Sequence, residues 1–369
     1  MIQKVKLKDI ALYSKGKQIN KEDLLDDGEY DYLNGGINPS GRTNKTNCEA
    51  NTITISEGGN SCGYINYMMY PFWCGAHCYY LYNTVENTKY LYYALKSQQN
   101  GIQNLRSGAC MPNIKKSDLG NLEILFDDDE HEQMRITNIL DNLGQIITYR
   151  KKELTKLDDL IKARFVEMFG DAVDNPMRWN KKQLQEIVTD DCTISYGIVQ
   201  TGDDQKDGVP VFRPVDIVNR IPKLEELKKT TEKISNKYKK TILKGREMLI
   251  TVRANIAETC IVGEEFKGCN VGRGIVPIRT KEDVMVLEFL KYILDSKHIN
   301  DDIKRKAKGI TLIQLNMQDL REIELIIPPI EKQKAYVQFA KQVDKSKVIS
   351  ENQLKNIAIL LTICSTIYI

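Results

Sequence analysis

The sequence predicts an α+β protein: two similar mixed α/β domains separated by two long helices packed as an antiparallel coiled coil. Three observations predict it. The chain repeats itself, each repeat opens with short strand and turn patterns, and each repeat closes with a long helical pattern. The length of 369 residues allows two domains of ordinary size. A hydrophobic share of 41% and a charged share of 28% are typical of a globular protein.

The internal repeat is visible when the chain is compared with itself. Residues 53–65 align without a gap with 249–261, and residues 90–95 align with 289–294. Further matches keep the same order in both halves: Leu7 and Ile10 with Leu184 and Ile187, Tyr32-Leu33 with Val211-Phe212, Gly108 with Gly309, and Asp118-Leu119 with Asp319-Leu320. So many ordered matches indicate one structural unit present twice.

The first part of each repeat is predicted to mix strands with short helices. β-branched and aromatic runs are broken by Gly, Asn and Pro, which is the pattern of strands and turns. The clearest strands are expected at 53–55, 79–82, 248–252 and 275–278, and short helices at 90–98 and 287–296.

A long helix is predicted from about Glu130 to Met168, after the acidic run 127–129, which suits a helix N-terminus. Its apolar residues recur at alternating steps of four and three, the seam of a coiled coil. These are Ile136, Leu140, Leu143, Ile147, Leu154, Leu157 and Ile161. At ~1.5 Å per residue the helix would be roughly 55–60 Å long.

A second long helix is predicted after Pro328 and Pro329, because prolines end the preceding strand and suit a helix start. Its seam lies two hundred residues further on, at Tyr336, Ala340, Val343, Lys347, Leu354, Ile357 and Leu361. The chain must travel out and return between the two helices, which favours an antiparallel pair. The alternative is that each helix covers only its own domain. The predicted parts are residues 1–129, 130–170, 171–328 and 329–369.

Charge and cysteine usage restrict the class of protein. The net charge of +3 excludes a polycation, so any nucleic-acid site must come from local basic surface. The nine cysteines are Cys48, Cys62, Cys74, Cys78, Cys110, Cys192, Cys260, Cys269 and Cys364. Their odd number, and a start at 1–10 that is not an apolar signal region, favour reduced thiols in the cytoplasm. The apolar stretch 358–369 is about half the ~20 residues of a membrane helix, so we expect a helix face for a partner and no membrane contact.

The sequence predicts no catalytic centre, no bound cofactor and no metal. Asn175-Pro176-Met177 is faintly similar to a methyltransferase motif, but its third residue differs and no Gly-rich nucleotide loop lies nearby, so a turn is favoured. The glycines at 58–59 and 272–274 are isolated. Cys74, His77 and Cys78 form the one candidate zinc cluster. Its spacing is irregular, and the repeat counterpart at 270–274 has no ligand residues.

Several of these segments resemble a known family. They are Phe165-Val-Glu-Met-Phe-Gly-Asp171 followed by Asn175-Pro-Met-Arg-Trp179, the run 328–333 with its copy at 127–133, and Tyr196-Gly-Ile198. All are similar to segments of the specificity (S) subunits of type I restriction-modification systems. The chain departs from that family in three places. Asp127-Asp128 stand where two prolines are usual, the second seam is interrupted at Lys347 and Ser350, and the last dozen residues are almost wholly apolar.

The resemblance implies a function. Each globular part would be a target recognition domain that reads one half of a split DNA site. The two helices would set the gap between the halves and dock two methyltransferase subunits, with or without a translocating, cleaving subunit. S-adenosylmethionine would bind to those methyltransferase subunits, and the S subunit itself would have no catalytic centre.

Side chains that suit DNA recognition lie in the turn-rich stretches of both globular parts. Arg fits guanine, Asn and Gln fit adenine, and Lys and Arg fit phosphates. In the first part these are Lys15, Lys17, Arg42, Lys45, Asn60, Arg106, Asn113, Lys115 and Lys116. In the second part they are Arg213, Arg253, Asn255, Arg273, Lys304, Arg305, Lys306, Lys308 and Gln314.

Three repeat-equivalent pairs are predicted to differ in side chain: Asn34 with Arg213, Glu57 with Arg253, and His77 with Arg273. A shared scaffold with different presented side chains is expected if the two parts read different sequences. Arg253 and Arg273 are the favoured base-reading residues because each flanks a predicted strand. The run 304–306 is expected to hold phosphate.

Two other functions compete with this one. The chain could be a self-contained DNA methyltransferase or nuclease with diverged motifs, which the missing cofactor loop argues against. It could also be a coiled-coil scaffold whose globular parts bind protein. Loss of binding with rising salt would separate a DNA reader from that scaffold.

Overall fold

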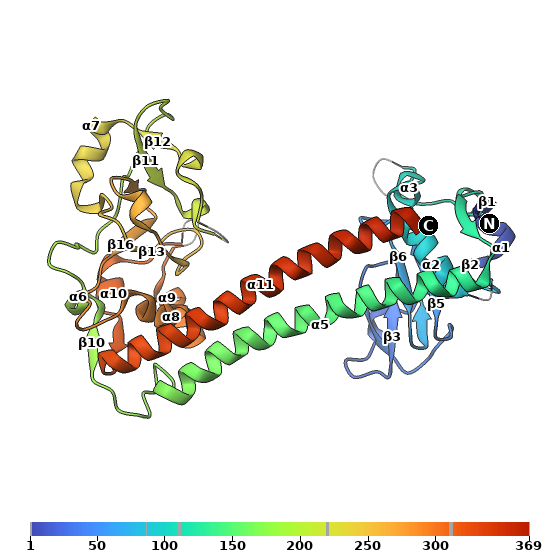
Figure 1. The fold of residues 1–369 in the computed structure, drawn as a ribbon, viewed down its shortest axis with the longest axis horizontal. Coiled ribbons are helices and arrows are strands. Elements are labelled where there is room, and N and C mark those ends of the chain that lie inside the picture. The colour runs from blue at the N-terminus through green and yellow to red at the C-terminus, as the bar shows by residue number, and fades with distance from the viewer. Residues whose placement is uncertain (1, 86, 109–111, 219–220, 310–312, 369) are drawn as a thin grey trace. The chain divides into compact units, whose positions relative to one another are not determined.

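The computed structural model describes residues 2–85, 87–108, 112–218, 221–309 and 313–368. The chain divides into two compact units (Figure 1). Unit 1 comprises residues 1–154 and 349–369, and unit 2 comprises residues 155–348. Each unit therefore contains one globular part together with a segment of each long helix, α5 (Glu130–Phe169) and α11 (Ile330–Tyr368).

Unit 1 is built on three small sheets. The largest is antiparallel, in the order β2 (Leu12–Lys15), β8 (Cys78–Tyr82), β5 (Thr52–Ser56) and β6 (Ile65–Met68). In the second, β3 (Tyr30–Leu33) pairs antiparallel with β4 (Gly41–Thr43) and parallel with β7 (Phe72–Cys74). The third pairs β1 (Ile2–Lys6) with β9 (Glu123–Asp127). The short helices are α1 (Leu7–Ile10), η1 (Lys21–Asp23), α2 (Thr88–Ser97), α3 (Gln99–Asn104) and α4 (Lys116–Gly120).

Unit 2 repeats this plan. The antiparallel sheet has the order β14 (Thr259–Ile261), β13 (Met248–Thr251) and β16 (Ile275–Ile278). In the second sheet, β11 (Val209–Phe212) pairs antiparallel with β12 (Lys229–Thr230) and parallel with β15 (Asn270–Val271). The third pairs β10 (Lys181–Gln183) with β17 (Glu324–Ile326). The helices are α6 (Leu184–Ile187), η2 (Pro214–Asp216), η3 (Leu224–Glu226), α7 (Glu232–Ser235), η4 (Asn236–Thr241), η5 (Glu264–Phe266), α8 (Leu287–Asp295), α9 (Lys297–Lys306) and α10 (Met317–Arg321).

The predicted duplication and mixed fold are confirmed, but the gapless alignment of 53–65 with 249–261 is wrong by one residue or more. Strand β5 pairs Ser56 with Cys78, and β13 pairs Thr251 with Ile275, so Ser56 corresponds to Thr251. No alignment without a gap fits both strands of this hairpin, because its length differs between the units. The connection from Ile55 to its partner Ile65 is one residue longer than the connection from Ile250 to Thr259.

Segments of the two long helices pack antiparallel in unit 2. Near the start of α11, the Tyr336 hydroxyl donates to the carbonyl of Ile161 near the end of α5, at 3.3 Å. The Tyr336 ring also lies 5.5 Å from the ring of Phe165. Further along α11, the Lys347 ammonium pairs with the Asp158 carboxylate, which lies earlier on α5.

Unit 1 contains the opposite ends of the same two helices. Leu361 and Cys364 of α11 pack against the core that includes Ile136 and Leu140 of α5. Both units thus contain segments of both helices in opposite directions. The predicted antiparallel pairing is confirmed, and the alternative that each helix covers only its own domain is wrong.

All of the predicted seam residues have side chains that are at least half-buried. Ile136, Leu140, Ile161, Tyr336, Ala340 and Val343 are buried, and Leu143, Ile147, Leu154, Leu157, Leu354, Ile357 and Leu361 are half-buried. The seam continues through its two polar residues, because Lys347 is half-buried and Ser350 is only 4% exposed. The sequence predicted that these two residues interrupt the seam. In the structure they occupy seam positions, and only the residue type changes from apolar to polar.

Each unit has its own hydrophobic core. The main core of unit 2 centres on Phe165, Phe169, Phe289 and Tyr336, whose rings contact one another. The core of unit 1 joins β5 and β8 to α2. Within the described ranges, no helix combines the length and the apolar character that crossing a bilayer requires.

Candidate nucleic-acid interface

Three candidate base-reading residues of unit 2 are brought together by the ends of its strands. Arg253 follows β13 and forms a backbone bridge with Gln314. The preceding residue, Val252, donates its amide to the carbonyl of Gly274 at 2.8 Å. This bond places the turn between β15 and β16, which carries Arg273, beside Arg253. The amide of Arg273 in turn donates to the carbonyl of Ile198 at 2.8 Å.

A glycine allows the loop at 196–198 to approach this cluster. A Cβ on Gly197 would lie 2.0 Å from the carbonyl oxygen of Val271, at the end of β15. The loop therefore brings Tyr196 to Gln314, whose side-chain amide donates to the Tyr196 hydroxyl at 2.5 Å. The same hydroxyl donates to the carbonyl of Leu315 at 3.2 Å. Gln314 is thus held in one orientation.

The basic side chains of unit 2 that are candidates for DNA binding form two groups: those that pair with a carboxylate among the described residues and those that do not. Asp216 binds Arg213 through two bonds of 3.0 and 2.7 Å. This hydrogen bonding raises the pKa of Arg213. Arg305 and Lys306 both pair with Asp302, at 3.4 and 3.1 Å. Arg253 and Arg273 are half-buried, and no carboxylate among the described residues pairs with either.

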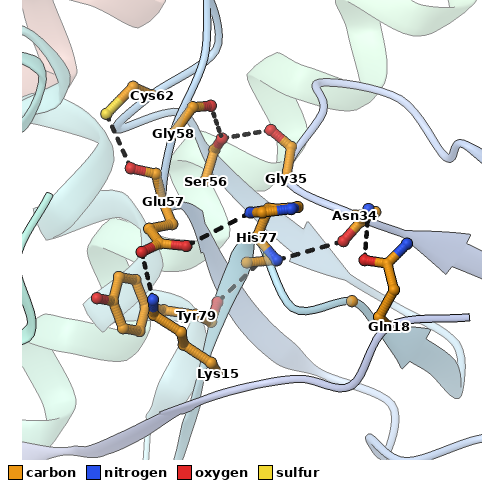
Figure 2. A network of polar contacts seen from close by, with 12 residues as sticks. Lys15, Gln18, Asn34, Gly35, Ser56, Glu57, Gly58, Cys62, His77 and Tyr79 are labelled. Atoms are coloured by element: carbon orange, nitrogen blue, oxygen red, sulfur yellow. Dashed lines mark hydrogen bonds and ion pairs between the residues drawn. The ribbon is translucent and has the colours of Figure 1, made fainter. Parts of the chain in front are cut away.

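Unit 1 presents a different set of side chains in the corresponding region (Figure 2). The Glu57 carboxylate, 12% exposed, pairs with the Lys15 ammonium and lies 3.7 Å from Nδ1 of His77. The Asn34 side-chain oxygen accepts the His77 amide at 3.2 Å, and its nitrogen donates to Gln18 at 3.2 Å. In this region unit 1 therefore presents a carboxylate and side-chain amides, whereas unit 2 presents the guanidinium groups of Arg253 and Arg273.

Tyr79 packs beside this network. Burial raises the pKa of Tyr79 to about 12, so its hydroxyl stays protonated and donates to the carbonyl of Ile114 at 3.0 Å. The Lys15 ammonium lies 5.6 Å from the centre of the Tyr79 ring. Ile114 corresponds to Leu315 in unit 2, because their amides bind the equivalent carbonyls of Glu57 and Val252. In both units a tyrosine hydroxyl therefore fixes this carbonyl.

Two of the predicted equivalences are wrong by one residue. The amide of Glu57 donates to His77 just as that of Val252 donates to Gly274, so Glu57 corresponds to Val252. Arg253 consequently corresponds to Gly58. Because Gly75 and Gly272 bind the equivalent carbonyls of Leu33 and Phe212, Arg273 corresponds to Ala76. The third equivalence, Asn34 with Arg213, agrees with this register, since the two residues directly follow Leu33 and Phe212.

The backbone pairing also shows that Asn113 corresponds to Gln314, an equivalence that the sequence analysis did not predict. Asn113 bridges Ser107 and Gly58, and Gln314 bridges Lys308 and Arg253. Each unit therefore places an amide side chain at the same point of the fold. The matched glycines Gly108 and Gly309 were a signal for it, because Asn113 and Gln314 follow them at the same spacing. The ion pair of Lys15 with Glu57 joins distant segments and had no sequence signal.

The other candidates are distributed over several elements. Arg42 lies on β4, where its guanidinium donates to the carbonyl of Glu29 at 3.1 Å. Lys304 lies in the last turn of α9, and Lys116 opens α4. Exposed residues complete the set: Lys17, Lys45, Asn60, Arg106, Asn113, Lys115, Asn255 and Lys308.

The two weaker chemical motifs have structural roles. The Asn175 side chain donates to the carbonyl of Trp179 and accepts its amide, both at 2.8 Å, as expected for a turn. Cys74 and Cys78 are buried in a small apolar core while His77 is exposed. Across the described ranges, no three His, Cys, Asp or Glu residues are arranged to hold a metal ion. Cys110 lies outside the described residues.

Known proteins share this sequence pattern. The family model of the type I restriction modification DNA specificity domain matches residues 2–158 and 176–358. A Mycoplasma genitalium protein provisionally named a type I specificity subunit is 41% identical over 148 residues, 37% of this chain and 38% of that protein. The EcoBI specificity subunit of Escherichia coli is 28% identical over 203 residues, 55% of this chain and 43% of that subunit. Each match spans less than half of the relative's length.

Solved structures share the fold. The crystal structure of the type I S subunit from M. genitalium matches 99% of this chain and 95% of that chain, with a TM-score of 0.65 and 22% identity. A chain from a structural study of type I complex assembly and conformational transition matches with a TM-score of 0.62 and 15% identity, covering 100% of this chain and 97% of that one. The family model covers most of both units, and the fold agrees with it. This chain belongs to the family of type I restriction-modification DNA specificity domains.

Proposed function

We propose that this chain is the DNA-reading, non-catalytic specificity subunit of a type I restriction-modification complex, and that it recognises a split DNA site. The observation that carries the proposal is the duplicated scaffold with different side chains at equivalent positions. Arg213, Arg253 and Arg273 of unit 2 stand where unit 1 has Asn34, Gly58 and Ala76. A shared backbone with different donors and acceptors suits two readers of different base sequences. The family match does not favour a self-contained enzyme or a protein-binding scaffold.

The proposed division of labour follows the four predicted parts of the chain. Residues 1–129 and 171–328 would be the two target recognition domains, and residues 130–170 and 329–369 the spacer helices. The exposed lysines and arginines would contact phosphates, whereas the residues gathered at the strand ends would contact base edges.

Partner subunits are proposed to dock on the long helices. In unit 1, α5 exposes Tyr149 at 65% and α11 exposes Ile359 at 57% and Leu360 at 49%. Apolar residues that stay exposed beside a packed seam are typical of a protein-binding surface. The expected partners are two methyltransferase subunits, which would carry S-adenosylmethionine, with or without restriction subunits. The cytoplasm is the expected location.

The test is co-expression with type I methyltransferase subunits, followed by genome-wide mapping of methylated adenines. The expected result is one methylated motif made of two short half-sites separated by an unread gap. A motif without a gap, or methylation that does not depend on this chain, would contradict the proposal.

Lengthening the helices tests their role as a spacer. Seven residues inserted after Leu154 in α5, together with seven after Val348 in α11, keep the seam in phase. The insertion adds about 10 Å of helix at ~1.5 Å per residue, or at most about three base pairs at ~3.4 Å each. The gap should lengthen while both half-sites stay the same. Seven residues inserted in the exposed loop at 203–207 are the control, and they should leave the gap unchanged.

A further inference from the structure

Arg253 and Arg273 stand out among the arginines of unit 2. Arg213 and Arg279 are also half-buried, but carboxylates of Asp216 and Glu247 hold them at 2.7 and 2.9 Å. Arg321 is half-buried as well, and its guanidinium donates to the carbonyl of Ile194 at 2.6 Å. Arg253 and Arg273 are half-buried too, and among the described residues neither a carboxylate nor a carbonyl holds their guanidinium groups. Removing a cation from water without an anion or acceptor is unfavourable. The pair is therefore suited to an external acceptor.

The backbone around the pair is firmly held. Val252, which precedes Arg253, binds Gly274 at 2.8 Å and accepts the amide of Leu315 at 2.8 Å. A Cβ placed on Gly274 would lie 3.3 Å from the Cβ of Arg253, so the two arginine-bearing turns are in close contact. Two guanidinium groups on adjacent, well-anchored turns can approach neighbouring bases without reordering the chain.

The chemistry of the guanidinium group selects the base. Its planar fork matches the two acceptors of guanine, N7 and O6, in the major groove. Lysine has the same charge but no fork. The neighbouring Gln314 amide, fixed by Tyr196, keeps its carbonyl oxygen available to accept a hydrogen bond from a base amino group.

Unit 1 lacks this pair. The equivalent positions are Gly58 and Ala76, which can reach no base edge. The Glu57 carboxylate, from the residue before Gly58, lies between Lys15 and His77 (Figure 2). A carboxylate accepts from cytosine or adenine amino groups and repels the acceptor face of guanine.

We propose that unit 2 reads guanine through Arg253 and Arg273, so that an arginine-dependent guanine preference is confined to one half of the split site. This inference rests on the proposed function and adds the base class of one half-site. It also gives a role to the two arginines that unit 2 carries where unit 1 has Gly58 and Ala76.

The experiment measures base preference with the complete complex of this chain and its methyltransferase subunits. Wild type, Arg253→Lys and Arg273→Lys are each incubated with a duplex library in which both half-sites are randomised, and bound DNA is sequenced. Each lysine variant should lose roughly 5- to 150-fold of its preference for guanine at one position, the discrimination of one two-pronged contact. The change should stay within one half-site, and the salt dependence of binding should stay the same because the charge is kept.

Lys304→Ala is the matched control, because Lys304 is exposed on the same unit and suited to phosphate. It should weaken binding to all sequences alike and reduce the salt slope by about one, without a change in base preference. Trp179 fluorescence of each variant of this chain alone, in a Trp73→Phe background, checks that unit 2 is folded.

The outcomes separate this inference from the proposed function. A gapped motif whose guanine preference is unchanged in both lysine variants would overturn the inference and leave the specificity role intact. A wild-type motif without guanine in either half-site would do the same. If the wild-type complex selects no motif at all, the proposed function fails as well.

Discussion

Replacing Tyr336 by alanine removes the aromatic side chain that links the two long helices in unit 2. Tyr336 is 1% exposed, and its ring lies 5.5, 5.6 and 5.2 Å from the rings of Phe165, Phe169 and Tyr292. Truncating a large buried aromatic side chain costs about 3–5 kcal/mol through lost burial and the cavity left behind. We expect Tyr336→Ala to lower the free energy of unfolding of unit 2 by that amount.

Tyr336→Phe separates ring packing from the hydroxyl bond. It keeps the ring and removes one hydrogen bond of 3.3 Å to the Ile161 carbonyl, which lies inside α5. That carbonyl keeps its helical hydrogen bond, so no buried acceptor loses its only partner. The expected cost is about 0.5–1 kcal/mol.

The assay is urea unfolding followed by tryptophan fluorescence. The chain has 2 tryptophans, Trp73 in unit 1 and Trp179 in unit 2. Separate units need not unfold together, so the measurement is made in a Trp73→Phe background where Trp179 reports on unit 2 alone. The ring of Trp179 lies 6.4 Å from that of Phe169, within the same core.

Val348→Ala on the same helix is the control. Val348 is 55% exposed, so its truncation should change stability by less than about 0.5 kcal/mol. A loss below about 1 kcal/mol for Tyr336→Ala, or equal effects of Tyr336→Ala and Val348→Ala, would show that the helices are not joined by this residue.

Two further predictions concern glycines and thiols. Gly197→Ala should destabilise unit 2 by about 1–3 kcal/mol in the Trp179 assay, because the new Cβ would lie 2.0 Å from the Val271 carbonyl. Gly144→Ala should instead stabilise unit 1 by about 0.5–1 kcal/mol, as reported by Trp73, because this helical position has open space around it. A more stable Gly197→Ala variant and a less stable Gly144→Ala variant would contradict these two predictions. Burial raises the pKa of Cys260 to about 12 and of Cys269 to about 11, so thiolate is scarce at pH 8. Iodoacetamide followed by peptide mass spectrometry should therefore label the half-exposed Cys364 well before either of them, and equal rates would show that neither thiol is shielded.

Hydrophobic spacing predicted the main elements of the fold. The acidic run at 127–129 placed the start of the first long helix at Glu130, where α5 begins, the seam pattern followed its length, and the β-branched run at 275–278 coincides with β16. These signals are strong because they repeat over many turns or concentrate within a few residues. The parallel pairs β3 with β7 and β11 with β15 were not predicted. Their strands are only two to four residues long, and the pairing joins segments that are distant in sequence.

The candidate site was predictable in its residue types but not in its register. Arg253, Arg273 and Gln314 were chosen for their chemistry, and the backbone brings all three together. Their partners in unit 1 were misplaced by one residue because matched residue types do not fix the hydrogen-bond register of short strands. The contacts around Glu57 depend on Lys15 and His77 from two other segments, and no local pattern encodes such a meeting.

The polar residues within the long seam limit how the two helices can slide. An apolar seam with a strict seven-residue repeat would accept its partner again after a shift of one repeat, about 10 Å. Such a shift would separate the half-buried Lys347 from Asp158, now 2.5 Å away, and leave its partly desolvated ammonium group to Asp344 of the same helix, at 3.6 Å. Lys347 therefore selects a single register, so a complex built on these helices would measure one gap length in DNA and reject its near neighbours.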